Sequence, residues 1–221
     1  MPIKIRDRSV QRIAIVDDEE AVRAGYEELV VDLNVDPVTE AGPLPDLETF
    51  VRRVVEHSDA VVCDFKLTGG PYSTFNGTAA VSRWYDQKHP ALLCTMWDTA
   101  MIDELRRHRA KIPVLVNPSD LDAGRIIQGF ETCLEEFSGN RVDGRKLYRT
   151  LVRVEDLSGS EERLPYAFLA IPAWIRAKIV PVPLADIPEH ARGQIVSGGR
   201  LYARVNLGAE ADEDLFFDSW G

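Results

Sequence analysis

The sequence is poor in cysteine and histidine, with three of the first and four of the second among 221 residues. The cysteines form no CxxC pair, and the histidines stand in no spacing typical of metal ligands. Neither a disulfide framework nor a zinc site is therefore expected. We interpret the three cysteines, Cys63, Cys94 and Cys133, as small core residues.

Long hydrophobic runs are also missing. No apolar stretch approaches the roughly 20 residues that a membrane span requires, and residues 1–10 lack the apolar core and cleavage site of a secretory signal. We therefore expect a cytoplasmic protein with no membrane partner. Its 45% hydrophobic and 28% charged residues are typical of a soluble globular chain with one large domain, or an ordinary one plus a small one.

Positive charge is scarce and unevenly placed. The net charge is −10, of which residues 1–137 carry −9, residues 138–209 carry +4 and the last twelve residues carry −5. Such an acidic first part repels a phosphate backbone, so nucleic acid is not an expected partner of residues 1–137. The mildly basic part leaves that possibility open for residues 138–209.

Residues 12–137 alternate short apolar runs with helical patterns. This alternation predicts an α/β fold with a five-stranded parallel sheet wrapped by helices. Helices are expected after the first strand, after Asp46, after Asn76, over 98–109 and over 121–137. The expected strands are 12–16, 35–39, 60–63, 91–94 and 112–116.

Beyond residue 138 the pattern changes to β-like runs separated by turn residues. We expect an α/β domain over 1–138, a small β-rich domain over 139–209, and an acidic-aromatic tail over 210–221. The tail could dock into a basic groove of a partner, fold back on the basic domain, or pack Phe216 and Phe217 as a last strand. The expected runs are 146–154, 166–171, 175–182 and 200–207.

Polar residues follow four of the expected strands: Asp17 with Asp18, then Asp64, Thr95 and Asn117. Ligand sites of open α/β sheets lie at the carboxyl ends of the strands. Carboxylates that converge there repel each other unless they share a hard cation, and Mg²⁺ is the natural one. With that metal, one carboxylate can attack a phosphoryl group, and the Thr95 hydroxyl can bond a phosphoryl oxygen.

These residues give the sequence a resemblance to the receiver domain of bacterial two-component response regulators, over about residues 10–137. The matching motifs are IAIVDDEE at 13–20, VVCDFKL at 61–67, Asn76-Gly77, Cys94-Thr95 and Asn117-Pro118. The resemblance implies a doubly wound, flavodoxin-like fold for these residues. It also implies a phosphoprotein of a phosphorelay that is not an enzyme in its own right. Its phosphoryl donor would be a histidine kinase or a phosphotransfer protein.

The resemblance also implies a role for each site residue. Asp64 would be the phosphoacceptor, and Thr95 the switch residue that moves toward the phosphoryl group. Asp18 would bind Mg²⁺ directly and Asp17 partly through water, while the backbone carbonyl of Lys66 would complete the protein ligands. Phosphorylation would then bias a two-state equilibrium that a protein partner of the β-rich domain or the tail detects.

Three features depart from the receiver pattern. Asn117 stands where receivers place a lysine, Met96 follows Thr95 where small residues are usual, and the 68–75 loop is long. A neutral amide cannot pair with phosphoryl charge as an ammonium does. Three functions therefore stay open: an atypical phosphorylated regulator, a phosphorylation-independent scaffold, and a regulator whose basic β-rich domain binds nucleic acid. Taken alone, Asn117 is most simply a turn residue.

Overall fold

The computed structural model describes residues 2–96, 101–159, 165–212 and 214–221, which divide into two compact units. The first contains the described residues within 1–98 and 111–140, and the second those within 99–110 and 141–221. The boundary expected after residue 138 lies close to the division at 140, while the helix expected over 98–109 is grouped with the C-terminal residues. Its first residues, 98–100, lie outside the described part.

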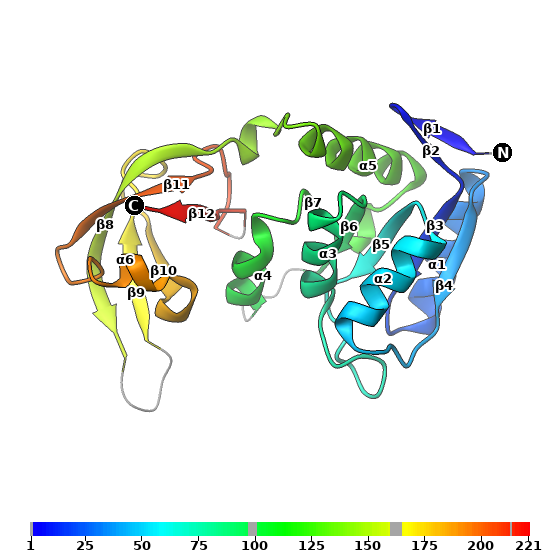
Figure 1. The fold of residues 1–221 in the computed structure, drawn as a ribbon, viewed down its shortest axis with the longest axis horizontal. Helices are drawn as coiled ribbons and strands as arrows, with labels where there is room; N and C mark the ends of the chain where they lie inside the picture. Colours follow the sequence, from blue (N-terminus) through cyan, green and yellow to red (C-terminus); the bar gives the residue numbers. More distant parts are fainter. Residues whose placement is uncertain (1, 97–100, 160–164, 213) are drawn as a thin grey trace. The chain divides into compact units, whose positions relative to one another are not determined.

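The first unit is built on a parallel sheet in the order β4-β3-β5-β6-β7 (Figure 1). Counted along the sheet, this is the 2-1-3-4-5 order of doubly wound, flavodoxin-like folds. The predicted fold class of residues 12–137 is thereby confirmed. The strands are β3 (Arg12–Val16), β4 (Asp36–Glu40), β5 (Ala60–Asp64), β6 (Ala91–Cys94) and β7 (Val114–Val116).

Four helices cover the two faces of this sheet. On one face, α1 and α5 pack with Ile13, Ile15, Val62 and Leu92 into one apolar cluster. On the other, α2 and α3 pack through the rings of Phe50 and Trp84, whose centroids are 5.8 Å apart. The helices are α1 (Glu20–Asp32), α2 (Leu47–His57), α3 (Gly77–Asp86) and α5 (Ala123–Phe137).

The caps of two helices explain where they begin. Asp46 accepts a hydrogen bond from the Thr49 amide at the start of α2, as its sequence position predicts. Asp122 accepts one from the Arg125 amide, so α5 begins two residues later than expected. These side chains satisfy backbone donors that the first helical turn leaves unpaired.

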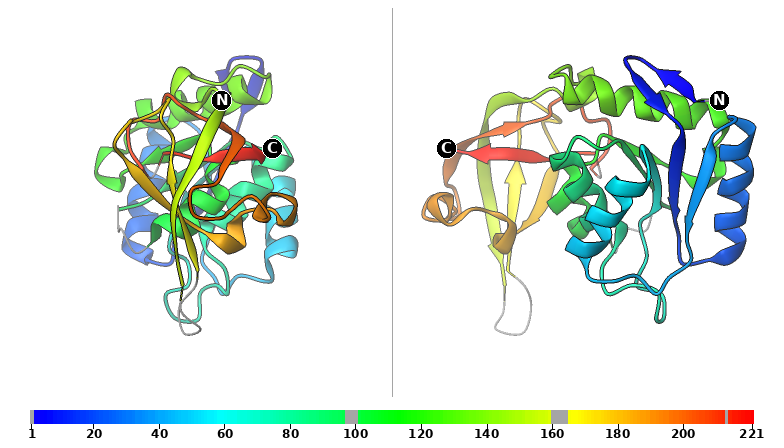
Figure 2. Two further views of the ribbon diagram at one scale, coloured as in Figure 1. Left: turned by 90° about the vertical axis from the view of Figure 1, so that its left-hand side faces the viewer. Right: turned by 45° about the vertical axis from the view of Figure 1, so that its right-hand side comes forward.

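An N-terminal hairpin that the sequence did not predict precedes the sheet. Strands β1 (Ile3–Ile5) and β2 (Arg8–Val10) pair in antiparallel fashion, and Ile5 and Val10 are buried in the cluster under α5 (Figures 1 and 2). Arg6 takes the turn with φ of 56° and pairs with Glu135 of α5. The hairpin therefore extends the apolar cover of α5.

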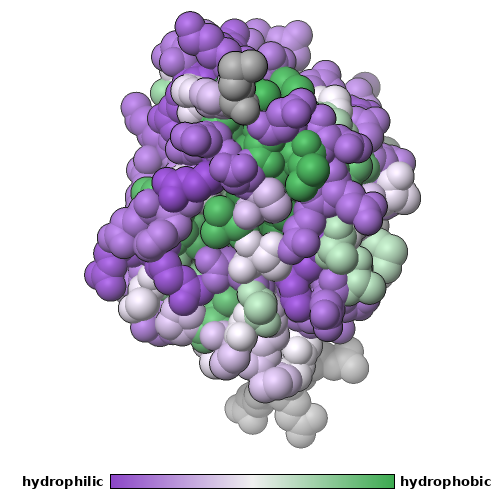
Figure 3. Space-filling view, turned by 90° about the vertical axis from the view of Figure 1, so that its right-hand side faces the viewer, coloured by the Kyte–Doolittle hydropathy of each residue, from purple (hydrophilic) through white to green (hydrophobic). Residues whose placement is uncertain are grey.

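Strand β4 forms one of the two edges of this sheet. Figure 3 shows the molecule from the side on which β4 and α1 lie, and most of that surface is hydrophilic with a hydrophobic band through its middle. Pro37 removes one backbone donor from the edge, and Asp36 and Glu40 place charge at its two ends. Proline and charge are the usual protection of an edge strand against pairing with another chain.

The second unit contains an antiparallel sheet in the order β10-β9-β8-β11-β12. Its inner face carries Val152, Leu169, Val180 and Leu201, which form a core with residues from the connection that contains α6 (Glu189–Arg192). The strands are β8 (Tyr148–Ser158), β9 (Tyr166–Ala170), β10 (Ile179–Pro183), β11 (Arg200–Val205) and β12 (Phe217–Trp220).

Helix α4 (Ile102–Arg109) packs against this second sheet through arginines. Arg106 donates to the carbonyl of Pro181 on the edge strand β10 at 2.8 Å. Arg109 pairs at 2.8 Å with Asp214, which leads into the opposite edge strand β12. The helix therefore bonds to one edge strand of the sheet and to the segment that precedes the other.

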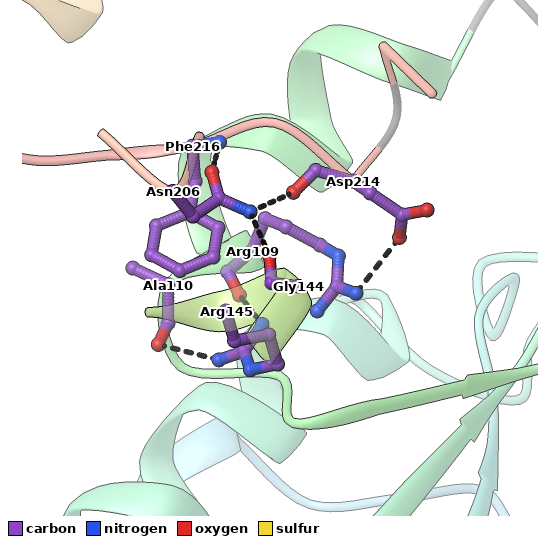
Figure 4. A network of polar contacts seen from close by, with 7 residues as sticks. All are labelled: Arg109, Ala110, Gly144, Arg145, Asn206, Asp214 and Phe216. Atoms are coloured by element: carbon purple, nitrogen blue, oxygen red, sulfur yellow. Dashed lines mark hydrogen bonds and ion pairs between the residues drawn. The ribbon is translucent and has the colours of Figure 1, made fainter. Parts of the chain in front are cut away.

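Arg145 fixes the C-terminal end of α4 (Figure 4). Its guanidinium donates to the carbonyls of Arg109 and Ala110 at 3.1 and 3.0 Å, and it lies 4.8 Å from the ring centroid of Phe216. A cation at a helix C-terminus is favourable because the unpaired carbonyls concentrate negative charge there.

The acidic C-terminal segment is part of this sheet. β12 pairs with β11, and Leu215 and Phe216 are fully buried. Asn206, also fully buried, donates to the carbonyls of Gly144 and Asp214 and accepts from the Phe216 amide (Figure 4). Of the three arrangements open for this segment, the last strand is the one observed, although Phe216 itself precedes it.

Among the helices of the described residues, none is both long and apolar enough to cross a membrane.

Candidate functional site

The strand register brings the predicted site residues to one edge of the first sheet. Val16 pairs with Cys63, and Cys94 pairs with both Asp64 and Val116. Asp17, Asp64, Thr95 and Asn117 therefore stand at the carboxyl ends of four neighbouring strands. This is the edge at which open α/β sheets bind their ligands.

Asp64 ends β5 and is partly buried. Its Oδ2 accepts a hydrogen bond from the Lys66 amide at 2.8 Å, which lowers the pKa and orients the carboxylate. Burial and then the negative charge of Asp17 act against this bond, and together they raise the pKa of Asp64 to about 7. The Asp64 carboxylate is thus held where its charge is costly unless a cation is near.

Asp17 is almost completely buried, and its carboxylate accepts from the Glu19 amide at 2.8 Å. Burial raises the pKa of Asp17 to about 6, with a smaller contribution from the charge of Asp18. Arg23 of α1, itself buried, donates to the Asp17 carbonyl. That guanidinium lowers the pKa of Asp17, though less than burial raises it.

Asp18 and Lys66 lie on the loops beside these two carboxylates. A Cβ on Gly69 would come within 2.0 Å of the Asp18 carboxylate oxygen, so a larger residue there would require the Asp18 side chain to move. The backbone amide of Lys66 faces Asp64, while its side chain is exposed. Gly69 was not singled out as a site residue from the sequence.

Thr95 follows β6 and is buried, with its amide bonded to the Val116 carbonyl at 3.0 Å. Its hydroxyl donates to the carbonyl of its neighbour Met96 at 3.3 Å. This is a long bond, and the hydroxyl gives up little by moving to a stronger acceptor. Met96 is 76% exposed.

Asn117 caps the short 3₁₀ helix Pro118–Asp120. Its Oδ1 accepts from the amide and the hydroxyl of Ser119, at 3.0 and 2.8 Å. The Asn117 side chain therefore stabilises a turn, as the simplest interpretation of the sequence predicts. Because its oxygen is engaged in this way, its amide nitrogen is the group that could face a ligand.

The long loop after Asp64 is anchored through Tyr72 and Arg23. Tyr72 is buried, donates to the Glu40 carbonyl at 2.6 Å and stacks against Gly42, where a Cβ would come within 2.4 Å of its ring. Arg23 lies 5.7 Å from the centroid of the same ring. Arg23 thus joins the loop to the Asp17 backbone. Its burial could not be predicted from the sequence, because it depends on contacts with residues far from α1 in the chain.

Helix α3 begins directly against the end of β5. The Gly77 amide donates to the Phe65 carbonyl at 2.8 Å, and a Cβ on Gly77 would lie 1.9 Å from the carbonyl oxygen of Asp64. Glycine at this position therefore permits the close approach that fixes the end of β5. Gly77 entered the sequence analysis only as part of a motif, without a stated role.

The floor of the site is apolar and holds two cysteines. Burial raises the pKa of the Cys94 thiol to about 12 and that of Cys63 well above its usual range. Tyr26 of α1 lies beside Cys94, and burial raises the pKa of its hydroxyl as well. These groups stay uncharged at neutral pH, so Asp17 and Asp64 sit above a floor that supplies no compensating charge.

The carboxylates suit a hard cation only in part. Within the described residues, no group of three or more His, Cys, Asp or Glu side chains converges closely enough to hold a metal ion. Mg²⁺, however, is often bound through one or two carboxylates with waters and phosphate oxygens completing its shell. Asp17 and Asp64, with charges that oppose each other in a buried setting, fit that mode.

Solved structures similar to this chain cover its N-terminal part. A response regulator receiver domain protein from Clostridium thermocellum is 12% identical, with a TM-score of 0.44, over 58% of this chain and 97% of that chain. The receiver domain of NtrX from Brucella abortus is 20% identical, with a TM-score of 0.42, over 56% and 98%. The structure of FixJ-N is 19% identical, with a TM-score of 0.42, over 57% and 94%.

The first unit has a doubly wound, flavodoxin-like fold. The strand order carries this statement. No family model matches the sequence, and no curated protein does.

Proposed function

We propose that this chain is an atypical response regulator whose receiver-like unit accepts a phosphoryl group on Asp64. The observation that carries the proposal is the setting of Asp64: a strand-end carboxylate, oriented by the Lys66 amide, with a pKa of about 7 caused by burial and by Asp17. Carboxylates with strongly shifted pKa values concentrate at functional sites, and a cation bound beside this one would offset the cost of its charge.

Mg²⁺ would be held directly by Asp18, by Asp17 partly through water, and by Asp64 and the Lys66 carbonyl. When bound, it neutralises the carboxylates and the incoming phosphoryl oxygens. The residues of the chain supply orientation: the Lys66 amide fixes the Asp64 carboxylate, and the Glu19 amide fixes that of Asp17.

The transfer is a displacement at phosphorus. An Asp64 carboxylate oxygen forms a bond to the phosphorus of a phosphohistidine on a histidine kinase or phosphotransfer protein. The P–N bond breaks, and the imidazole leaves with the bonding pair and takes up a proton. The product is an acyl phosphate on Asp64 and a neutral histidine on the donor. The protein acts as a stoichiometric acceptor.

The missing lysine sets the speed of this reaction. Asn117 offers one neutral amide where an ammonium would pair with phosphoryl charge, and its oxygen is engaged by Ser119. We expect slow phosphorylation and weak switching because a neutral donor forms a weaker hydrogen bond than a charged one.

The output would pass along the chain from Thr95 to α4. Movement of the Thr95 hydroxyl from Met96 to the phosphoryl group would be the local change that phosphorylation makes. Because Arg106 and Arg109 join α4 to the β-rich part of its unit, a change that reached α4 would alter the surface offered to a protein partner.

The test is the intact mass of the full chain after incubation with Mg²⁺ and phosphoramidate, with Asp64→Asn and Asn117→Lys in parallel. The proposal predicts gain of one phosphoryl group by the parent, faster gain by Asn117→Lys, and none by Asp64→Asn. Equal gain by Asp64→Asn would contradict it.

A phosphorylation-independent scaffold is the second candidate, and the use of the Asn117 oxygen as a turn cap favours it. It predicts no mass gain by the parent, either with phosphoramidate or with a phosphorylated histidine kinase of the same source. Gain by Asn117→Lys alone would then locate the defect at that residue.

A further inference from the structure

The outward face of the second sheet carries an arrangement of arginines that its own stability does not explain. In the register of β8 and β11, Arg149 stands opposite Arg204 and Arg153 opposite Arg200. All four side chains are exposed, on the face that turns away from the core residues Val152 and Leu201. Like charges directly opposite each other on a sheet are destabilising.

Between the two arginine pairs lies an apolar pair, Leu151 opposite Tyr202. The Tyr202 ring is 44% exposed, and the Arg149 guanidinium lies 3.9 Å from its centroid. Directly opposite side chains are about 5 Å apart at Cβ, and four residues of strand span about 13 Å. The arginine face, defined as Arg149, Leu151, Arg153, Arg200, Tyr202 and Arg204, is thus a platform with cations at its corners and a ring near its centre.

Two of the corner cations have carboxylate neighbours and two do not. Arg153 pairs with Glu155 at 2.5 Å, and Arg204 approaches Asp218 at 3.7 Å. Within the described residues, neither Arg149 nor Arg200 forms an ion pair. The diagonal of the platform therefore carries two cations available to an anionic ligand, in a chain whose net charge is −10.

We infer that the arginine face binds single-stranded nucleic acid. Guanidinium groups bind phosphates through paired N–H donors, and an exposed ring with an arginine stacked on it offers a flat surface to a base. An acidic peptide would satisfy the arginines but would leave the ring unused. Arginines that surround one aromatic platform match a strand in which phosphates alternate with bases.

The face is built from neighbouring strands of one sheet, β8 and β11 (Figure 2), and its geometry does not depend on Asp64. Binding is therefore expected with or without a phosphoryl group, and its test is separate from that of the proposed function. The acidic residues 1–137 oppose the approach of a polyanion, so the interaction is expected to be weak at physiological salt.

The test is fluorescence anisotropy of labelled oligo(dT) and oligo(U) of roughly 12 nucleotides, within the usual site size, titrated with the full chain at about 50 mM salt. Duplex DNA and a poly-glutamate peptide serve as competitors. The inference predicts binding of one or both single strands, with a log–log salt slope of about −1.5 to −3, because each phosphate contact on a single strand contributes about −0.7.

Two variants and a matched control locate the binding. Arg149→Ala/Arg200→Ala is expected to weaken binding at least about tenfold and to reduce the salt slope by about 1.4. Tyr202→Ala is expected to cost at least about fivefold while Tyr202→Phe keeps most of the affinity. The control, Arg52→Ala/Arg176→Ala, removes two exposed arginines elsewhere and should leave affinity within about twofold.

Three outcomes overturn the inference. One is no anisotropy change up to roughly 100 μM protein, the weak end of non-specific binding. Another is equal loss in the control and the Arg149→Ala/Arg200→Ala variant, which would mean that overall charge alone attracts the strand. The third is tighter binding of poly-glutamate than of either oligonucleotide, which would assign the face to an acidic protein segment. Circular dichroism of each variant excludes unfolding as the cause of a loss.

Discussion

The negative charge of Asp17 is, after burial, the main reason that the pKa of Asp64 is about 7. One residue follows β3 and the other ends β5, so the parallel pairing of these strands creates the interaction. The thiols of Cys63 and Cys94 in the floor beneath them are uncharged, so they do not offset this negative charge. The chemistry of the site therefore begins with a carboxylate pair that a cation would relieve.

Removing the charge of Asp17 should lower the pKa of Asp64. In Asp17→Asn, ¹³C NMR of the Asp64 carboxyl group without divalent cations should show titration below the parent value of about 7. Asp36→Asn is the control, because it removes an exposed carboxylate at the opposite edge of the sheet. An unchanged Asp64 titration in Asp17→Asn would show that burial alone sets the value.

The same pair should make stability depend on pH. The pKa values of Asp17 and Asp64, about 6 and 7, lie above the ordinary 3.8, so the folded state binds protons more tightly than the unfolded state. Their stabilising contribution is complete below about pH 4 and is lost as pH rises through 6 and 7.

In urea unfolding with EDTA, the double variant Asp17→Asn/Asp64→Asn should gain about 1–3 kcal/mol on the parent between pH 5 and pH 8. Added Mg²⁺ should restore the parent at pH 8 and leave the double variant unchanged. A parent whose stability rises over this range as much as that of the variant would contradict the pKa values.

Gly77 and Gly25 should respond to alanine in opposite directions. The Cβ of Gly77→Ala would lie 1.9 Å from the Asp64 carbonyl, so α3 must shift, at a cost of about 1–3 kcal/mol. Gly25 lies inside α1 with no atom within 4 Å of an added Cβ, so Gly25→Ala should stabilise by about 0.5–1 kcal/mol. Urea unfolding at pH 6 measures both, and a stabilised Gly77→Ala would refute the close approach.

Asn206 should be the residue on which the C-terminal strand depends. Asn206→Ala leaves two partly buried carbonyls and the buried Phe216 amide without their partner, so we expect a loss of about 2–4 kcal/mol. Hydrogen exchange of β11 and β12 should accelerate together with that of α4. Gln194→Ala, at an exposed position of the same unit, should leave exchange unchanged. Retained protection of β12 in Asn206→Ala would show that strand pairing alone holds the segment.

The parallel sheet could be predicted because its signals are local. Buried runs such as residues 60–64 alternate with helices that have clear caps, and strand ends in such a sheet meet at one edge by geometry. The positions of Asp17, Asp64, Thr95 and Asn117 along that edge follow from the pattern alone. Where the side chains point does not, because the Asn117 oxygen is turned by a bond to Ser119 two residues away.

Other features depend on partners far apart in the chain. The eight residues of α4 have a helical pattern, but nothing local shows that Arg106 and Arg109 are buried. Their partners, Pro181 and Asp214, follow them in the chain by 75 and 105 positions. The hairpin of β1 and β2 has three-residue strands and an arginine at its positive-φ turn, so it lacks the usual turn signal. The arginine face required the register of β8 and β11, which no single strand contains.

The most direct measurement of the central claim is the identity of the phosphorylated residue. The full chain, incubated with Mg²⁺ and phosphoramidate, is reduced with borohydride, which converts an aspartyl phosphate to homoserine, and its peptides are sequenced by mass spectrometry. The account predicts homoserine at position 64, at a higher yield in Asn117→Lys. No homoserine in either protein, or homoserine at position 17 or 18 instead, would contradict it.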